Sequence, residues 1–195
     1  MIKAQTLKGF RGKKRIAIFI DAANFEVSLR SLKVKADFGK VDQYFGVSKV
    51  VLKNYYSVDF KNSAQGRLFT YLKHHYFKLI TKSIKLIRRR GSSNLRKANF
   101  DVEISFDSVM LKDKYDIMIL LSGDSDFVYM VQELQKLGKK VVVVSPQFRT
   151  AKELRKAADK FVDLKEVSFL IKEKGPLWAR KNNLSTAQKS IIKKG

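Results

Sequence analysis

Apolar, β-branched runs alternate with segments of helical periodicity, and this alternation constrains the fold more than any other feature of the sequence. The runs occupy residues 15–21, 47–58, 83–89, 115–122 and 139–145, and helical segments are expected at 22–32, 63–80, 100–111 and 126–138. Strands that are buried on both faces and separated by helices form an open parallel sheet. The sequence therefore predicts an α/β fold with an open, mainly parallel five-stranded sheet that carries helices on both faces.

The length of 195 residues fits one well-buried domain with short extensions. We expect a basic N-terminal extension over 1–14, a domain over 15–172 and a basic C-terminal extension over 173–195. No apolar run approaches the roughly 18 residues of a membrane span, and no secretion signal is recognised, so a membrane location is not expected. The chain has no cysteine, which excludes disulfides and thiolate metal sites and fits a reducing, cytoplasmic location.

Charge points to a class of partner. The 41 Lys and Arg residues outweigh 18 Asp and Glu residues, and the formal net charge of +23 is spread along the whole chain. Solubility alone needs a net charge of only about 2 to 8 for a small domain. A polyanion such as RNA is the partner that this excess favours, and a solubilising surface or an anionic membrane is the alternative.

Several polar side chains follow the ends of predicted strands. Asp21 ends the first strand, Asn24 lies three residues later, and Asp124 and Asp126 follow the fourth strand in "LLSGDSDF". Ligands of open parallel sheets bind beyond the carboxyl ends of the strands. If the first and fourth strands are neighbours, these residues face one crevice, and Asp101 at the start of a predicted helix adds a further carboxylate.

Two interpretations of these residues stay open. Each of them can be a helix cap, and Ser122 and Ser125 can close the turn or orient the carboxylates. Several acids that converge in so basic a protein are, in contrast, typical of a site for a hard cation such as Mg²⁺ or Mn²⁺. We therefore expect Asp21, Asp101, Asp124 and Asp126 to be metal ligands.

The motifs "IDAANF", "LLSGDSDF" and "GKKVVVVS", in this order and spacing, resemble the NYN (LabA-like) family of the PIN-like nuclease superfamily over about residues 13–165. The resemblance implies a PIN-like, Rossmannoid fold. It assigns catalytic roles to Asp21, Asn24, Asp101, Asp124 and Asp126. The sequence departs from the family pattern at Ala22, where many relatives carry Gly, and it has no Gly between Lys97 and Asp101. Glu103 therefore stays an alternative to Asp101 as the central acid.

The function that the resemblance implies is a metal-dependent endoribonuclease, a hydrolase in which water attacks an RNA phosphodiester. The alternative of another class is a non-catalytic RNA-binding module on the same fold. A phosphatase of the HAD-like type is a third alternative, but its Asp-x-Asp motif would need an acid where Ala23 stands. His74 and His75 are the only histidines, and helical periodicity favours a place on a helix face over general acid–base catalysis.

Binding of RNA is expected at the basic segments. The loop that precedes Asp101 carries Arg88, Arg89, Arg90, Arg96 and Lys97, although a solvated charge run is the competing interpretation. The C-terminal extension is basic, and its Trp178 is expected to pack on the domain. The sequence leaves the RNA substrate, the preferred metal and the existence of a homodimer open.

Overall fold

The structure is a computed structural model that describes residues 14–44, 49–83, 99–167 and 170–172. Its centre is a six-stranded sheet in the order β4-β3-β1-β5-β6-β7, with every neighbouring pair parallel, and β2 and β8 form a separate antiparallel pair. The elements are β1 (Arg15–Asp21), α1 (Ala22–Leu32), β2 (Val34–Ala36), η2 (Phe38–Lys40), α2 (Val41–Tyr44), β3 (Lys49–Asp59), α3 (Ser63–His74), β4 (Lys78–Ser83), α4 (Asp101–Met110), η3 (Lys112–Lys114), β5 (Ile117–Leu121), η4 (Ser125–Phe127), α5 (Val128–Lys136), β6 (Lys140–Ser145), η5 (Gln147–Arg149), α6 (Lys152–Ala157), β7 (Lys160–Asp163), η6 (Leu164–Glu166) and β8 (Leu170–Lys172), where η marks a 3₁₀ helix.

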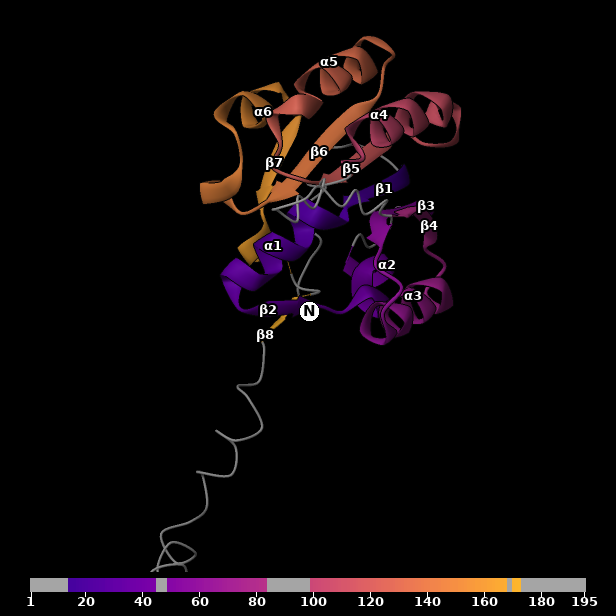
Figure 1. The fold of residues 1–195 in the computed structure, drawn as a ribbon. Coiled ribbons are helices and arrows are strands. Elements are labelled where there is room, and N and C mark those ends of the chain that lie inside the picture. The colour runs from indigo at the N-terminus through magenta and orange to yellow at the C-terminus, as the bar shows by residue number, and fades with distance from the viewer. Residues whose placement is uncertain (1–13, 45–48, 84–98, 168–169, 173–195) are drawn as a thin grey trace, which may run out of the picture.

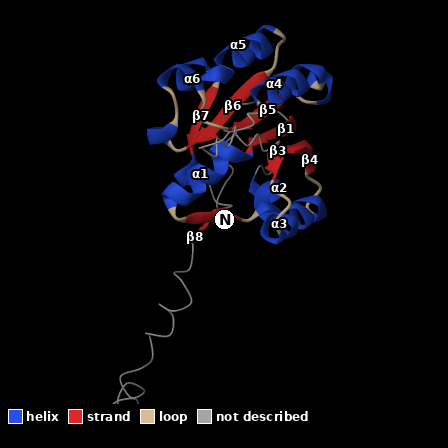
Figure 2. Cartoon of the chain, viewed as in Figure 1, coloured by secondary structure: helices blue, strands red, loops and turns tan. Residues whose placement is uncertain are grey.

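Helices cover both faces of the sheet, as Figures 1 and 2 show. One face packs against α1, α2 and α3, and the other packs against α4, α5 and α6. The alternating residues of β1 serve the two cores, with Ile18 on the first face and Phe19 on the second. The helix side chains buried on the first face include Phe25, Val41 and Leu72. Those buried on the second face include Ile104, Val131 and Leu154.

The central strands are apolar throughout because both of their faces are buried. All five residues of β5 are buried, and so are the last five of the six in β6. The α/β class with a mainly parallel sheet, predicted from these runs, is confirmed. The sheet has six strands in place of the predicted five, because the edge strand β7 is only four residues long and was not recognised.

The order of the strands creates a topological switch point. From β1 the chain builds β3 and β4 on one side, and it then crosses to build β5, β6 and β7 on the other. β1 and β5 are therefore direct neighbours, with Ile20 opposite Leu121. The carboxyl ends of these two strands meet at the place where doubly wound sheets bind ligands.

The predicted boundaries between 63 and 89 are wrong. The helix α3 ends at His74 instead of residue 80, and the strand that follows is β4 at 78–83 rather than 83–89. Tyr76 has a positive φ of 61° and breaks the helix without a glycine. The apolar residues Tyr76 and Leu79 happen to continue the helical spacing of Leu72, and this coincidence explains the error.

Several predictions concern residues outside the described parts of the chain. These are the extension over 1–13, the basic residues Arg88, Arg89, Arg90, Arg96 and Lys97, and Trp178 with the segment 173–195. Their roles stay predictions. Among the helices of the described residues, none combines the length and the apolar character of a membrane-spanning segment.

Candidate functional site

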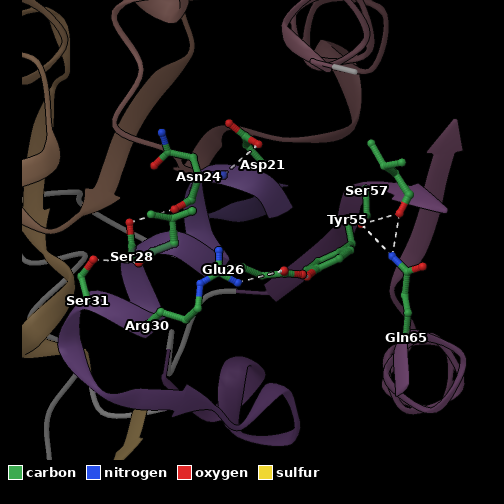
Figure 3. Close-up of polar contacts among 11 residues, drawn as sticks. Asp21, Asn24, Glu26, Ser28, Arg30, Ser31, Tyr55, Ser57 and Gln65 are labelled. Atoms are coloured by element: carbon green, nitrogen blue, oxygen red, sulfur yellow. Dashed lines mark hydrogen bonds and ion pairs between the residues drawn. The ribbon is translucent and has the colours of Figure 1, made fainter. Parts of the chain in front are cut away.

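Asp21 lies at the switch point and joins two elements. It is the last residue of β1 and caps α1, since its Oδ1 atom accepts a hydrogen bond of 3.3 Å from the backbone N–H of Asn24 (Figure 3). Its Oδ2 atom accepts a second hydrogen bond of 3.1 Å from the hydroxyl of Ser122. With only 8% of its surface exposed, this carboxylate is held in one orientation.

Asn24 connects α1 with the turn after β5. Its Oδ1 atom accepts a hydrogen bond of 3.1 Å from the backbone N–H of Gly123. The amide oxygen is thus used to position the turn that carries Asp124. The side chain does lie among the acids, as the sequence predicts, and this contact gives it a positioning role.

Ser122 performs both of the tasks left open by the sequence. Its hydroxyl donates to Asp21 and accepts from the backbone N–H of Asp124, at 3.1 and 3.3 Å. It closes the turn and orients a carboxylate at once. Ser125 is exposed on the first turn of η4, and no hydrogen bond of its hydroxyl is found in the described residues.

Asp124 and Asp126 occupy the start of η4. Asp124 is its N-cap, because its Oδ1 atom accepts a hydrogen bond of 3.2 Å from the backbone N–H of Asp126. Asp126 itself is exposed. The capping interpretation therefore holds for Asp124, but the cap uses one oxygen only and leaves the other for a ligand.

Gly123 fits the turn because it has no side chain. A Cβ atom at this position would lie 2.7 Å from the carbonyl oxygen of Arg149 and 2.8 Å from the hydroxyl of Ser145. The backbone N–H of Ala151 also donates to the carbonyl of Gly123 at 3.1 Å. The acidic turn is therefore packed directly against the segment that follows β6.

The start of α4 brings in a third segment. Asp101 is the first residue of this helix, and its Oδ2 atom accepts a hydrogen bond of 2.7 Å from the side chain of Asn99. Glu103 forms an ion pair of 2.6 Å with Lys82, which also binds the carbonyl of Asn99. Since Glu103 is already paired with Lys82 through one oxygen, Asp101 fits the role of the central acid better.

The carboxylates at the end of β1, after β5 and at the start of α4 affect one another electrostatically. Burial is the largest cause that raises the pKa of Asp21, and the charge of Asp124 adds to it, while the hydrogen bonds from Asn24 and Ser122 oppose it. Partial burial likewise raises the pKa of Asp101, followed by the charges of Asp124, Asp21 and Asp126. The four acids therefore lie close enough to destabilise one another when they are ionised.

The donor set fits a hard divalent cation. It consists of carboxylate oxygens, which Mg²⁺ and Mn²⁺ prefer. A cation would offset both the burial of the charges and their repulsion, which together raise the pKa values of Asp21 and Asp101. In the described parts of the chain, however, no set of three or more His, Cys, Asp or Glu side chains is already arranged as the ligands of a metal ion. Mg²⁺ needs only one or two protein carboxylates beside water and phosphate oxygens, so the site can still hold it.

Other polar residues prove to have structural roles. Asp107 accepts a hydrogen bond of 2.8 Å from the Tyr56 hydroxyl, and Asp116 accepts one of 2.8 Å from Arg15. His74 and His75 lie between the end of α3 and the start of β4. They are therefore near the amino ends of the strands, whereas the acids lie at the carboxyl ends. The role of Lys82 as the partner of Glu103 is not predicted from the sequence. The sequence places the strand at 83–89, whereas β4 spans 78–83 and includes Lys82.

Comparisons with known proteins identify the family and the fold. A family model described as the NYN domain matches residues 15–165. The chain is 31% identical over 168 residues to the low amplitude and bright protein LabA of Synechococcus elongatus, which covers 83% of this chain and 90% of that protein. The crystal structure of a protein of unknown function from Vibrio parahaemolyticus superposes with a TM-score of 0.69 at 26% identity, covering 83% of this chain and all of that one.

Proposed function

The chain belongs to the NYN domain family, and from this premise we propose that it is a metal-dependent endoribonuclease that hydrolyses RNA phosphodiester bonds. The family lies within a nuclease superfamily, which supports the reaction class. One observation carries the assignment of the site. Asp21, Asp101 and Asp124 come from three separate segments and meet at the switch point, where burial and, after it, the charge of Asp124 raise the pKa values of Asp21 and Asp101.

Each acidic residue receives a role in this proposal. Asp21 and Asp124, whose carboxylates are held by hydrogen bonds, would be the main ligands of the cation, and Asp101 and the exposed Asp126 would contribute further carboxylate oxygens. A bound divalent ion supplies a water of lowered pKa and neutralises the charge of the phosphate. Ser122 and Asn24 keep Asp21 and the turn of Asp124 in register, since their hydrogen bonds join α1 to the segment after β5.

The choice of RNA rests on charge. A net charge of +23 attracts a phosphate backbone, whereas the acids repel it unless a cation intervenes. RNA attracted by the Lys and Arg residues of the chain would therefore reach the carboxylates only when the metal is bound. This explains why a strongly basic protein concentrates acids at one point.

The direct test is incubation of purified protein with labelled single-stranded and structured RNAs in Mg²⁺, Mn²⁺ or EDTA. We expect cleavage within the strand in the presence of either ion and none in EDTA. Cleavage that continues in EDTA would refute metal dependence. An Asp124→Asn preparation, purified in parallel, controls for contaminating nucleases.

A second candidate is an RNA-binding module without turnover. It is favoured by the lack of a ready-made metal cluster in the described residues. On this alternative the protein binds RNA with unchanged affinity in EDTA and leaves it intact in both metals. The incubation above, extended by a measurement of binding affinity in EDTA, separates the two candidates, because binding and cleavage are then measured on the same RNA.

A further inference from the structure

A hollow lies at the same edge of the sheet as the acids, beyond the carboxyl ends of β6 and β7. Its lining residues are Gln147, Phe148, Arg155, Asp163 and Lys165. Its volume is about 380 Å³, within the roughly 300–1,000 Å³ of small-molecule sites. Since β6 is the direct neighbour of β5, the hollow is separated from the acidic turn by a single strand position.

The hollow presents an aromatic surface beside a positive charge. Phe148 is 61% exposed, and the ammonium of Lys165 lies 5.3 Å from the centre of its ring. An aromatic ring that faces solvent next to a cation can stack a planar base while the cation contacts a phosphate. A buried core phenylalanine offers neither contact.

Arg155 adds a second positive charge beside Lys165. Its guanidinium carbon lies 5.9 Å from the centre of the Phe161 ring. The residue lines the hollow, and a phosphate oxygen is the acceptor that a guanidinium prefers. Asp163 also lines the hollow, where its Oδ1 atom accepts from the backbone N–H of Lys165, and its other oxygen can accept from a base N–H.

The hollow is connected to the acidic turn through the backbone. The segment that bears Phe148 contacts Gly123 through the carbonyl of Arg149, and Ala151 donates a hydrogen bond of 3.1 Å to Gly123. Asp124 follows Gly123 directly. A single nucleic-acid strand bound in the hollow would therefore continue onto the carboxylates with no helix or β-strand of the protein between them.

We propose that this hollow binds one nucleotide of single-stranded RNA, with the base stacked on Phe148 and its phosphate held by Arg155 and Lys165. Its task in placing the scissile bond rests on the function proposed above, but the binding itself does not. A duplex hides its bases from such a ring, so the hollow favours unpaired RNA.

The test is the affinity for a short, fluorescein-labelled single-stranded RNA, measured by anisotropy in EDTA so that no cleavage occurs. Phe148→Leu keeps an apolar side chain but removes the stacking surface, and it should weaken binding about tenfold. Phe148→Trp should retain the affinity of the original chain. Lys165→Gln should lower the slope of log affinity against log salt by about 0.7, the value for one phosphate of a single strand.

Tyr76→Leu is the matched control. Tyr76 is also an exposed aromatic residue near a lysine, with Lys53 at 5.8 Å, but it lies before β4 at the opposite edge of the sheet. Its substitution should leave the affinity unchanged. Equal effects of Tyr76→Leu and Phe148→Leu, or no effect of Phe148→Leu in a folded protein, would overturn the proposal.

Two further arms identify the source of the nucleotide. A blunt duplex of the same sequence should respond less to Phe148→Leu than the single strand does. Adenosine monophosphate should compete poorly, whereas strong, Phe148-dependent competition would assign the hollow to free nucleotides instead. Because metal is absent throughout, failure of the nuclease proposal would leave these results standing, and the reverse also holds.

Discussion

At the scale of single residues, the proposed site depends on carboxylates that repel one another. Asp21 is fixed by two hydrogen bonds and Asp124 by its cap, so neither can move apart to relieve the repulsion. A site of this kind is destabilised by its own charge until a cation binds. Stability and activity should therefore respond in opposite directions when one carboxylate is neutralised.

Asp124→Asn tests this opposition. We expect cleavage to be abolished, while the melting temperature in EDTA is unchanged or slightly higher, because the amide oxygen can keep the cap and one repulsion is removed. The readouts are cleavage of labelled RNA and thermal unfolding with and without Mg²⁺. Cleavage at the original rate would show that Asp124 is not part of the site.

Asn24→Ala should act through structure. It removes the acceptor of the Gly123 N–H, and the loss of a partly buried hydrogen bond destabilises a protein by about 1–2 kcal/mol. We expect a smaller loss of cleavage than in Asp124→Asn, together with a measurable drop in chemical stability. Asn24→Asp retains an acceptor oxygen but adds a charge among the acids, so it should recover less of the stability in EDTA than in Mg²⁺. An Asn24→Ala protein of undiminished stability would contradict the positioning role.

At the scale of elements, the turn between β5 and η4 is specified by its glycine. Gly123→Ala would bring a Cβ atom within 2.7 Å of a backbone carbonyl, so the turn or the segment after β6 must shift. We expect a destabilisation of about 1–3 kcal/mol and reduced cleavage. Denaturant unfolding gives the first quantity and RNA cleavage the second.

Gly66→Ala is the control for that substitution. Gly66 lies inside α3, and a Cβ atom there would meet nothing within 4 Å. The change should stabilise the protein by about 0.5–1 kcal/mol, because alanine favours the helix. If both glycine variants lost stability alike, the close approach at Gly123 would not explain its effect.

The amino ends of β1 and β5 are joined by a separate contact. The Arg15 guanidinium donates a hydrogen bond of 2.8 Å to Asp116 and lowers the pKa of this carboxyl to about 2. A lowered pKa stabilises the fold above the unfolded value of about 3.9, and this contribution disappears as the pH falls toward 2.

Asp116→Asn should therefore lower stability at pH 7, with a difference from the original chain that shrinks below about pH 4. The side chain is 35% exposed, so screening by solvent limits the effect to about 1 kcal/mol. Asp113→Asn, at a carboxylate that is 83% exposed, should change little. Urea unfolding at a series of pH values measures both, and a difference independent of pH would refute the ion-pair account.

The features that could be predicted from the sequence are those visible in a short stretch of residues. The buried strands over 115–122 and 139–145 and the acids that end β1 and follow β5 are visible in short windows, since apolar runs and strand ends are local features. Asp21 and Asp124 lie near each other because β1 and β5 are adjacent parallel strands. The helix end at His74 was missed, because Tyr76 adopts its positive φ in the folded context and carries no glycine signal.

The contacts around the site could not be predicted in the same way. The pairing of Glu103 with Lys82, which favours Asp101 as the proposed central acid, joins residues of two elements, β4 and α4, and depends on how they pack. The same holds for the close approach of Gly123 to Arg149 and for the hollow at Phe148. Such contacts are set by tertiary packing, which single-sequence patterns do not encode.

At the scale of the whole molecule, charge and fold cooperate. On the proposed function, the net charge of +23 attracts RNA to the surface, and the switch point between β1 and β5 gathers the acids at one place on it. Cations should therefore have opposite effects on the two steps. Monovalent salt weakens the binding of RNA by screening, whereas a low concentration of Mg²⁺ or Mn²⁺ enables cleavage.

The most direct measurement of the central claim is the chemistry of the RNA ends that the protein produces, determined by mass spectrometry after reaction in Mn²⁺. Attack by a metal-activated water gives linear phosphate ends, and an RNA with a 2′-deoxy sugar at the cleaved position should still be cut. We predict this result, with no products in EDTA. Cyclic 2′,3′-phosphate ends, formed equally in EDTA and lost with the 2′-deoxy sugar, would contradict the account.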